Sequence, residues 1–289
     1  MDLRLLSSVG GFFALRTGRP DGGPDGAVPL ARVYREPLVY REYGVHRAYE
    51  AGPEPADDPL AFRVDKVTAS LGAPEARIGA SVAQLGLAAR LWSVSLGAAA
   101  LYGRVLDLDP GRLRWDPDGT SPDDLWLDEA HTPPLDGPST TDPLAATDPL
   151  AATDRLTTTD GLAVSDLLAT TDQLAASVLD GHLVPLGAAL RRRHRIAEPL
   201  LWGNAGSALA GAVRELHTWA RREGRPEAAA RALALGTALF RRPELAATGT
   251  LDTTARPPRF RRRSCCLYYR CPGAGVCGDC CFDRPPGRN

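Results

Sequence analysis

Apolar residues recur at helical spacing over much of the chain. In the clearest stretch, from Glu75 to Tyr102, they follow one another at steps of three and four and so mark one face of a helix. Pro226 suits the first turn of a later helix, and Pro243 would stop it. The ranges predicted to be helical are 31–49, 75–102, 179–190, 199–222 and 226–242.

The apolar pattern changes its period between residues 106 and 127. In 106–108 and in 113–115, leucine or tryptophan flanks a charged residue, which is typical of a half-buried strand. The predicted strands are 106–108, 113–115 and a third at 125–127, with an Asp-Pro-Gly turn joining the first two. Residues 245–263 show no clear period and are predicted to be loop-like. The predicted fold class is α+β, mostly α-helical, with a small antiparallel sheet near 104–128 and an irregular C-terminal segment.

A six-residue repeat runs through residues 141–176, with Asp and Leu each recurring at every sixth position. Six residues turn an α-helix by about 600°, so successive leucines lie about 120° apart and form no stripe. A parallel β-helix is the alternative, but these short Ala/Thr/Asp units are less rich in β-branched residues than the coils of such folds. The repeat is therefore interpreted as a low-complexity insert or linker. The organisation that follows is an N-terminal α+β region (1–136), the insert (137–176), a helical region (177–255) and a Cys-rich segment (256–289).

Charge and hydropathy exclude several classes of protein. The formal net charge of −1 argues against a nucleic-acid-binding protein. No stretch reaches the roughly 18–20 apolar residues of a membrane span, and Asp2 and a short apolar run argue against a secretory signal. The expected location is cytoplasmic, with at most a peripheral contact at the inner membrane face.

The cysteines carry the strongest chemical signal. All six lie between Cys265 and Cys281, whereas a disulfide framework would spread them through the fold. Four of them form the pattern C-C-x10-C-x2-C, namely Cys265, Cys266, Cys277 and Cys280. Four thiolates at close range hold an iron–sulfur cluster or zinc. Cys271 and Cys281 are additional, and either is a possible substitute ligand.

With this motif the chain resembles the ferric siderophore reductases of the FhuF type, whose mark is a C-terminal C-C-x10-C-x2-C that binds a 2Fe–2S cluster. The flanking residues of Cys265 and Cys280 are also similar to that family, as are the segment 200–204 and the Gly-Gly-Phe-Phe at 10–13. The resemblance implies a 2Fe–2S cofactor on Cys265, Cys266, Cys277 and Cys280. The repeat insert lies outside it.

The resemblance further implies an oxidoreductase that reduces Fe(III) in ferric siderophores, with hydroxamates as the expected class. The chain has no G-x-G-x-x-G or P-loop pattern, so electrons are expected from an external ferredoxin or flavin reductase. Residues 256–289 hold eight Arg against two Asp. This basic segment would either dock an acidic ferredoxin or offset the charge of the cluster.

Two alternatives remain open on the sequence alone. Trp202 and Asn204 are candidate siderophore contacts, but a Trp beside Gly also suits core packing. For the whole protein, the alternatives to a siderophore-iron reductase are a 2Fe–2S electron carrier or redox sensor, and a structural four-cysteine zinc-binding module.

Overall fold

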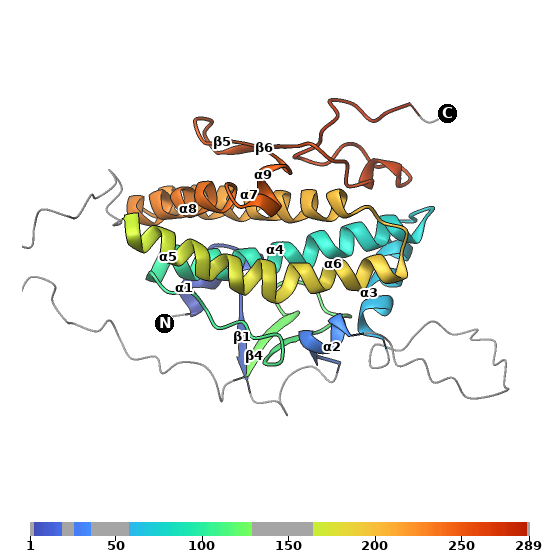
Figure 1. Cartoon of the computed structure of the whole chain (residues 1–289), viewed down its shortest axis with the longest axis horizontal. Helices are drawn as coiled ribbons and strands as arrows, with labels where there is room; N and C mark the ends of the chain where they lie inside the picture. Colours follow the sequence, from blue (N-terminus) through green and yellow to red (C-terminus); the bar gives the residue numbers. More distant parts are fainter. Residues whose placement is uncertain (1–2, 19–25, 36–57, 129–163, 288–289) are drawn as a thin grey trace, which may run out of the picture.

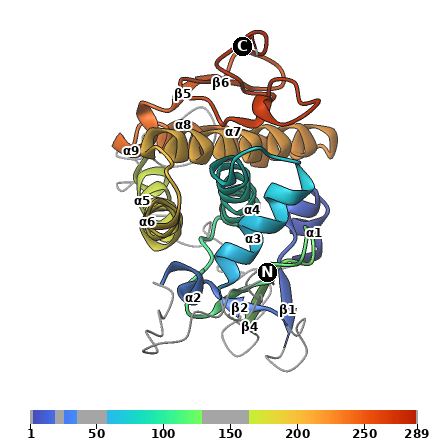
Figure 2. The ribbon, with the colours of Figure 1, turned by 90° about the vertical axis from the view of Figure 1, so that its right-hand side faces the viewer.

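The computed structural model describes residues 3–18, 26–35, 58–128 and 164–287. Long helices form a central layer, and Figure 1 shows them running side by side along the length of the molecule. A small sheet lies on one side of this layer, and the C-terminal strands and cysteine segment lie on the other, as the end view in Figure 2 makes plain. The fold is mostly α with small sheets, as predicted.

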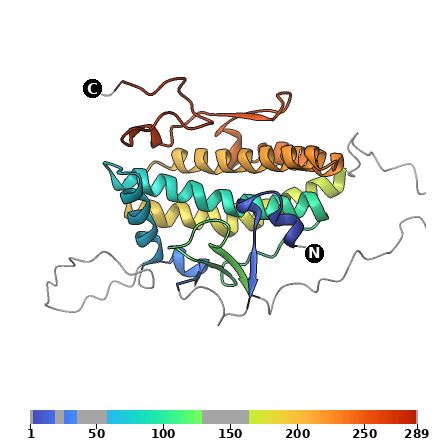
Figure 3. The same ribbon diagram turned by 180° about the vertical axis from the view of Figure 1, so that it is seen from behind.

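Helix α4 (Ala76–Tyr102) is the centre of the helical layer and confirms the clearest sequence prediction. It packs on α3 (Pro59–Ser70), α7 (Glu198–Arg222) and α8 (Pro226–Leu239). Figure 3 shows it from the back of the molecule. Within the described ranges α4 alone is long and apolar enough to cross a membrane, yet 72% of its most apolar window is buried inside the protein.

A second helical rod runs beside α4 and consists of three consecutive parts. These are α5 (Val164–Leu174), a π-helical stretch (Ala175–Leu183) and α6 (Val184–Arg193). The predicted helix at 179–190 is present, but helical structure already begins inside the repeat. The last copies of the repeat, from residue 164, belong to this helical rod, and Leu174 of the last copy is fully buried in the core. The earlier copies, up to residue 163, lie outside the described residues.

The small sheet differs from its prediction in membership and direction. Its strands are β1 (Arg16–Gly18), β2 (Val28–Pro29), β3 (Leu113–Trp115) and β4 (Leu125–Asp128), in the order β1-β4-β3-β2. β1 runs parallel to β4 and the other pairs are antiparallel, so the sheet is mixed. The third predicted strand, at 125–127, therefore pairs with β3, and the sequence-distant β1 lies on its other side.

The predicted strand at 106–108 does not form. The Asp107 carboxylate accepts a hydrogen bond from the Asp109 N–H at 3.1 Å, and the Asp109 carboxylate accepts one from the Gly111 N–H at 2.7 Å. These turns bend the backbone away from the sheet. Leu106 and Leu108 are nevertheless buried, which is the origin of their apolar alternation.

The N-terminal part adds short elements around the sheet and α4. They are α1 (Leu3–Ser7), a 3-10 turn (Gly11–Phe13) and α2 (Leu30–Tyr34). The helix predicted at 31–49 is thus present at its start, and its continuation from residue 36 lies outside the described residues.

Residues 243–262 are ordered, which corrects the prediction of a loop. Helix α9 (Pro243–Ala246) is followed by β5 (Gly249–Asp252) and β6 (Arg259–Arg262), which pair in antiparallel register. Phe260 and Arg262 are buried in β6, whereas Arg259 and Arg261 are exposed. The strand therefore has the expected alternation of burial, but arginine occupies three of its four positions, on both faces, and this hides the alternation from sequence analysis.

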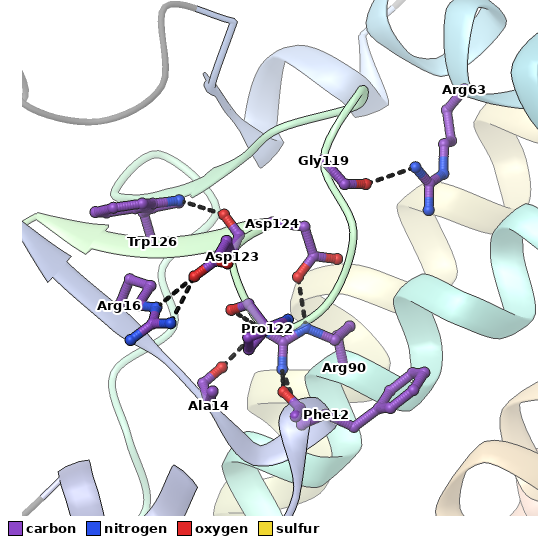
Figure 4. A network of polar contacts seen from close by, with 11 residues as sticks. Phe12, Ala14, Arg16, Arg63, Arg90, Gly119, Pro122, Asp123, Asp124 and Trp126 are labelled. Atoms are coloured by element: carbon purple, nitrogen blue, oxygen red, sulfur yellow. Dashed lines mark hydrogen bonds and ion pairs between the residues drawn. The ribbon is translucent and has the colours of Figure 1, made fainter.

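A buried polar network joins the sheet to α4 (Figure 4). The Arg90 guanidinium is 1% exposed and donates to the Asp124 carboxylate at 2.8 Å. It also donates to the carbonyls of Gly11 at 3.0 Å, Ala14 at 2.6 Å and Phe12. Since every partner comes from the N-terminal segment or the loop before β4, Arg90 holds both onto the helical layer.

Candidate metal centre

The cysteine segment lies against the outer side of α7, after β6 (Figure 2). The Cys266 side chain forms hydrogen bonds with those of both Cys265 and Cys277. Cys280 is close enough to act electrostatically on Cys277, and its side chain is hydrogen-bonded to that of Cys281. Pairwise contacts therefore link the four predicted ligands and Cys281 along one short segment.

The thiols strongly affect one another's protonation. Hydrogen bonds with Cys265 and Cys277 lower the pKa of the Cys266 thiol well below its usual value. The same bonds raise the pKa of Cys265 and of Cys277, and burial adds to both increases. Cys266 is therefore the member of the group that most favours the thiolate form, which is the form that ligates metals.

Backbone N–H groups also point at the sulfur atoms. Leu267 donates to Cys265 Sγ at 3.2 Å, and Phe282 donates to Cys280 Sγ at 3.4 Å. Leu267 has a positive φ of 69°, a conformation uncommon for a residue with a side chain. The turn that it makes leads into the 3-10 turn Tyr268–Arg270 and directs the chain away after the cysteine pair.

A relay of hydrogen bonds ties the cysteine pair to the helical layer. The Asn204 amide on α7 donates to the Ser81 carbonyl at 2.9 Å and to Ser81 Oγ at 3.0 Å. Ser81 Oγ on α4 in turn donates to the Cys266 carbonyl at 2.8 Å. Both side chains are fully buried, so α4 and α7 together fix the backbone of Cys266.

A close backbone approach fixes the residue before the pair. Ser264 Oγ donates to the Pro199 carbonyl at 3.0 Å. A Cβ atom on Gly203 would lie 2.0 Å from Ser264 Oγ, so only glycine permits this approach of α7 to the segment.

The second half of the segment is held by Asp279, which lies between Cys277 and Cys280 in the sequence. Its buried carboxylate accepts hydrogen bonds from Ser207 and, at 3.2 Å, from Arg214, both on α7. Its carbonyl accepts a hydrogen bond from the Arg262 N–H at 2.9 Å. Sequence reasoning missed Ser81, Ser207, Asp279 and Arg262; the acidic residue inside C-G-D-C was the one local signal for any of them.

The two candidate siderophore contacts have different environments. Asn204 is fully buried and engaged with Ser81, so it lies in the packing between helices and not on a surface that a siderophore could reach. Trp202 is half-buried and lines a cavity of about 170 Å³ between α4, α6 and α7, together with Gln84, Arg191 and Glu198. The structure does not bring Trp202 and Asn204 into one site.

The additional cysteines also differ. Cys281 is half-buried within the thiol group, whereas Cys271 is 2% exposed and its carbonyl accepts a hydrogen bond from Ala274. Among the described residues, no three His, Cys, Asp or Glu side chains are gathered as ligands of a single ion. Paired thiols with N–H donors to sulfur suit an iron–sulfur cluster, whose ligands are divided between metal atoms.

Comparison with known families agrees with this chemistry. A family model described as "Ferric iron reductase FhuF-like transporter" matches residues 87–258, more than half of the chain. A second, described as "FhuF 2Fe-2S C-terminal domain", matches residues 262–282 and so covers all six cysteines. No curated protein and no solved structure matches the chain. The four-cysteine zinc module considered above is therefore incorrect, because the matched segment is a 2Fe–2S domain.

Proposed function

Since the chain belongs to the FhuF-like ferric iron reductase family and carries that family's 2Fe–2S domain, we propose that it reduces Fe(III) in ferric hydroxamate siderophores. The observation that carries this proposal is the group of thiols on the segment that Ser81, Asn204 and Asp279 anchor to α4 and α7. When bound, the cluster supplies one electron at a time. The products are an Fe(II) chelate and an oxidised protein, which an external donor then reduces.

We assign the cluster ligands to Cys265, Cys266, Cys277 and Cys280. The hydrogen bonds that join Cys266 to its neighbours support this set, as do the N–H donors to Cys265 and Cys280. Cys281 is the substitute that this geometry favours, because its side chain contacts that of Cys280.

The chain's contribution to the reaction is to hold the site rigid and partly open. Ser81, Asn204 and Asp279 fix the backbone on both sides of the thiols, so little rearrangement need accompany a change of charge. Cys265, Cys277 and Cys280 are half-buried, which lets a chelate approach from solvent. Hard oxygen ligands favour Fe(III), so adding an electron weakens the complex and promotes release of iron.

Exposed arginines lie close to the cysteines along the chain, and two of them, Arg261 and Arg270, form surface ion pairs with Asp283 and Glu75. Arg259, Arg261 and Arg263 are exposed around β6, and Arg270 follows in the 3-10 turn. We propose that they dock an acidic electron donor, a ferredoxin or a flavin reductase, in the cytoplasm. The described residues offer no support for the expected contact with a membrane face. Trp202 remains the proposed siderophore contact because of the cavity that it lines.

The decisive experiment mixes the reduced protein with a ferric hydroxamate. Protein purified without oxygen is reduced with dithionite, freed of excess reductant and mixed with ferric desferrioxamine in the presence of an Fe(II) chelator. Return of the oxidised visible spectrum, with one Fe(II) captured per cluster, is expected. A spectrum that stays reduced would contradict the siderophore proposal and favour the alternative, an electron carrier or redox sensor for another partner.

A further inference from the structure

Arg262 is a buried cation at the centre of the cysteine segment. Its side chain is 2% exposed, and its backbone N–H donates to the carbonyl of Asp279. Its Nε donates to the Ser264 carbonyl at 3.0 Å, directly before the cysteine pair, and its Nη2 lies 3.4 Å from the Leu200 carbonyl. One residue therefore joins both halves of the segment to α7.

The charge of Arg262 is not neutralised by a carboxylate among the described residues, where its partners are carbonyl oxygens. Its Nη1 is buried and has no hydrogen-bond partner in that part of the chain. Asp279 is nearby, but its carboxylate is already engaged by Ser207 and Arg214. A buried cation without a counter-charge is costly, so its retention calls for an anion close by.

The thiols supply that anion when they ligate the cluster. Arg262 acts electrostatically on Cys266, Cys277 and Cys281, which places its charge near both halves of the ligand set. A four-thiolate 2Fe–2S cluster is anionic and gains one further negative charge on reduction. A fixed, poorly solvated cation therefore stabilises the reduced state more than the oxidised state.

We propose that Arg262 is a positioning residue for the reduction potential of the cluster. Its buried guanidinium, which has no carboxylate partner among the described residues, raises that potential. The inference rests on the ligand set proposed above but not on the siderophore. The potential is measured on the protein alone, without a siderophore. Failure of the inference about Arg262 is therefore distinguishable from failure of the reductase proposal.

The neighbouring arginines provide matched controls. Arg261 is exposed and pairs with Asp283 at 2.9 Å, and Arg263 is exposed on the other side of Arg262. All three carry the same charge at nearly the same distance along the chain from the cysteines. Solvent screens the two exposed charges, so only the buried one should act strongly on the cluster.

The test is a redox titration of the holoprotein, followed by visible absorption and by EPR of the reduced state. In R262Q and R262M the ratio of reduced to oxidised cluster at a fixed potential should fall about tenfold, which corresponds to about 59 mV. R262K, which keeps the charge, should lower the potential by less than half of that amount. R261Q and R263Q should shift the ratio less than twofold.

The proposal is overturned if R262Q and R262M have the reduction potential of the wild type. It is also overturned if R261Q and R263Q shift the potential as much as R262Q and R262M do. Neutral variants that bind no cluster would move the decision to iron content. In that case, cluster retained in R262K supports the role of the charge, and equal loss in R262K and R262Q contradicts it.

Discussion

Two buried arginines, Arg90 and Arg262, lie on opposite sides of the helical layer and have opposite surroundings. Arg90, on the sheet side, meets the Asp124 carboxylate and the carbonyls of the N-terminal segment (Figure 4). Arg262, on the cysteine side, donates to carbonyl oxygens, and its Nη1 has no hydrogen-bond partner within the part of the chain that the structure describes. The charge of Arg90 is neutralised by Asp124, so this site contributes to the stability of the fold. The second leaves charge available to a group that the chain must bind.

The largest expected effect is on the cysteine side. Cys266→Ser should abolish the visible absorption and reduce bound iron from about two per chain to almost none, because Cys266 is a proposed ligand and contacts two others of the proposed set. Iron and sulfide analysis after anaerobic purification provides the measurement.

Cys271→Ser is the matched control for that loss, since Cys271 is equally buried in the same segment. It should retain its full complement of iron. Cluster lost in Cys271→Ser and retained in Cys266→Ser would show that the ligand assignment is wrong.

On the sheet side the largest expected effect is on stability. Asp124→Asn removes the counter-charge of a buried guanidinium and should lower the free energy of unfolding by about 3–5 kcal/mol. Urea denaturation followed by far-UV circular dichroism measures this, and the cluster potential should not change.

A surface ion pair in the same region provides the comparison for the stability loss in Asp124→Asn. Asp123 pairs with Arg16 at 2.6 Å, but both side chains are largely exposed. Asp123→Asn should therefore cost at most about 1 kcal/mol. Equal losses in the two Asn variants would refute the distinction between buried and exposed pairs.

Low pH should also destabilise the sheet side of the molecule, through protonation of His182. Its ring is fully buried between the Tyr34 hydroxyl and the Leu108 carbonyl, each at 2.7 Å, and burial lowers its pKa to about 4. Between pH 6.5 and about 4, His182 is protonated in the unfolded chain but neutral in the folded protein. The free energy of unfolding therefore falls as the pH falls. The loss should be roughly 2–3 kcal/mol by pH 4.

Denaturation curves of the wild type and His182→Gln between pH 7.5 and 4.5 isolate this effect. Glutamine can keep one donor and one acceptor at the site but does not titrate, so the variant should have a flatter pH dependence. Identical slopes in the two proteins would exclude His182 as the source.

A smaller effect than at Cys266, Asp124 or His182 is expected from the relay beneath the cysteine pair. Ser81→Ala removes the donor to the Cys266 carbonyl and the acceptor for Asn204, so it should cost about 1–2 kcal/mol. We expect the visible spectrum to bleach several-fold faster in air or with chelator.

Ser95, also fully buried on α4, has an Oγ without a partner among the described residues. Ser95→Ala should therefore change neither stability nor bleaching appreciably. A Ser95 variant that bleaches as fast as the Ser81 variant would indicate general loosening of α4 and not a role for the relay.

Local patterns were sufficient for the long helices and, through the family that the cysteine motif resembles, for the cofactor. The apolar spacing within Ala76–Tyr102 and Glu198–Arg222 predicts those helices, because burial of one face selects residues at three- and four-residue steps. The clustered cysteines predict a four-thiolate metal centre, and the resemblance of their motif to a known family predicts that this centre is a 2Fe–2S cluster. The same local reasoning failed for Leu106 and Leu108, whose burial in a turn copies the alternation of a strand.

The sequence by itself therefore determined the helical layer, the 2Fe–2S chemistry and the family of the protein. Only the tertiary structure decided that β1 joins β4, that Asn204 supports the cysteine segment through Ser81, and that one arginine in a run of three is buried. The physical reason is distance along the chain. Contacts between segments separated by many residues leave no periodic or spacing signal, and whether a charge is solvated depends on what packs over it.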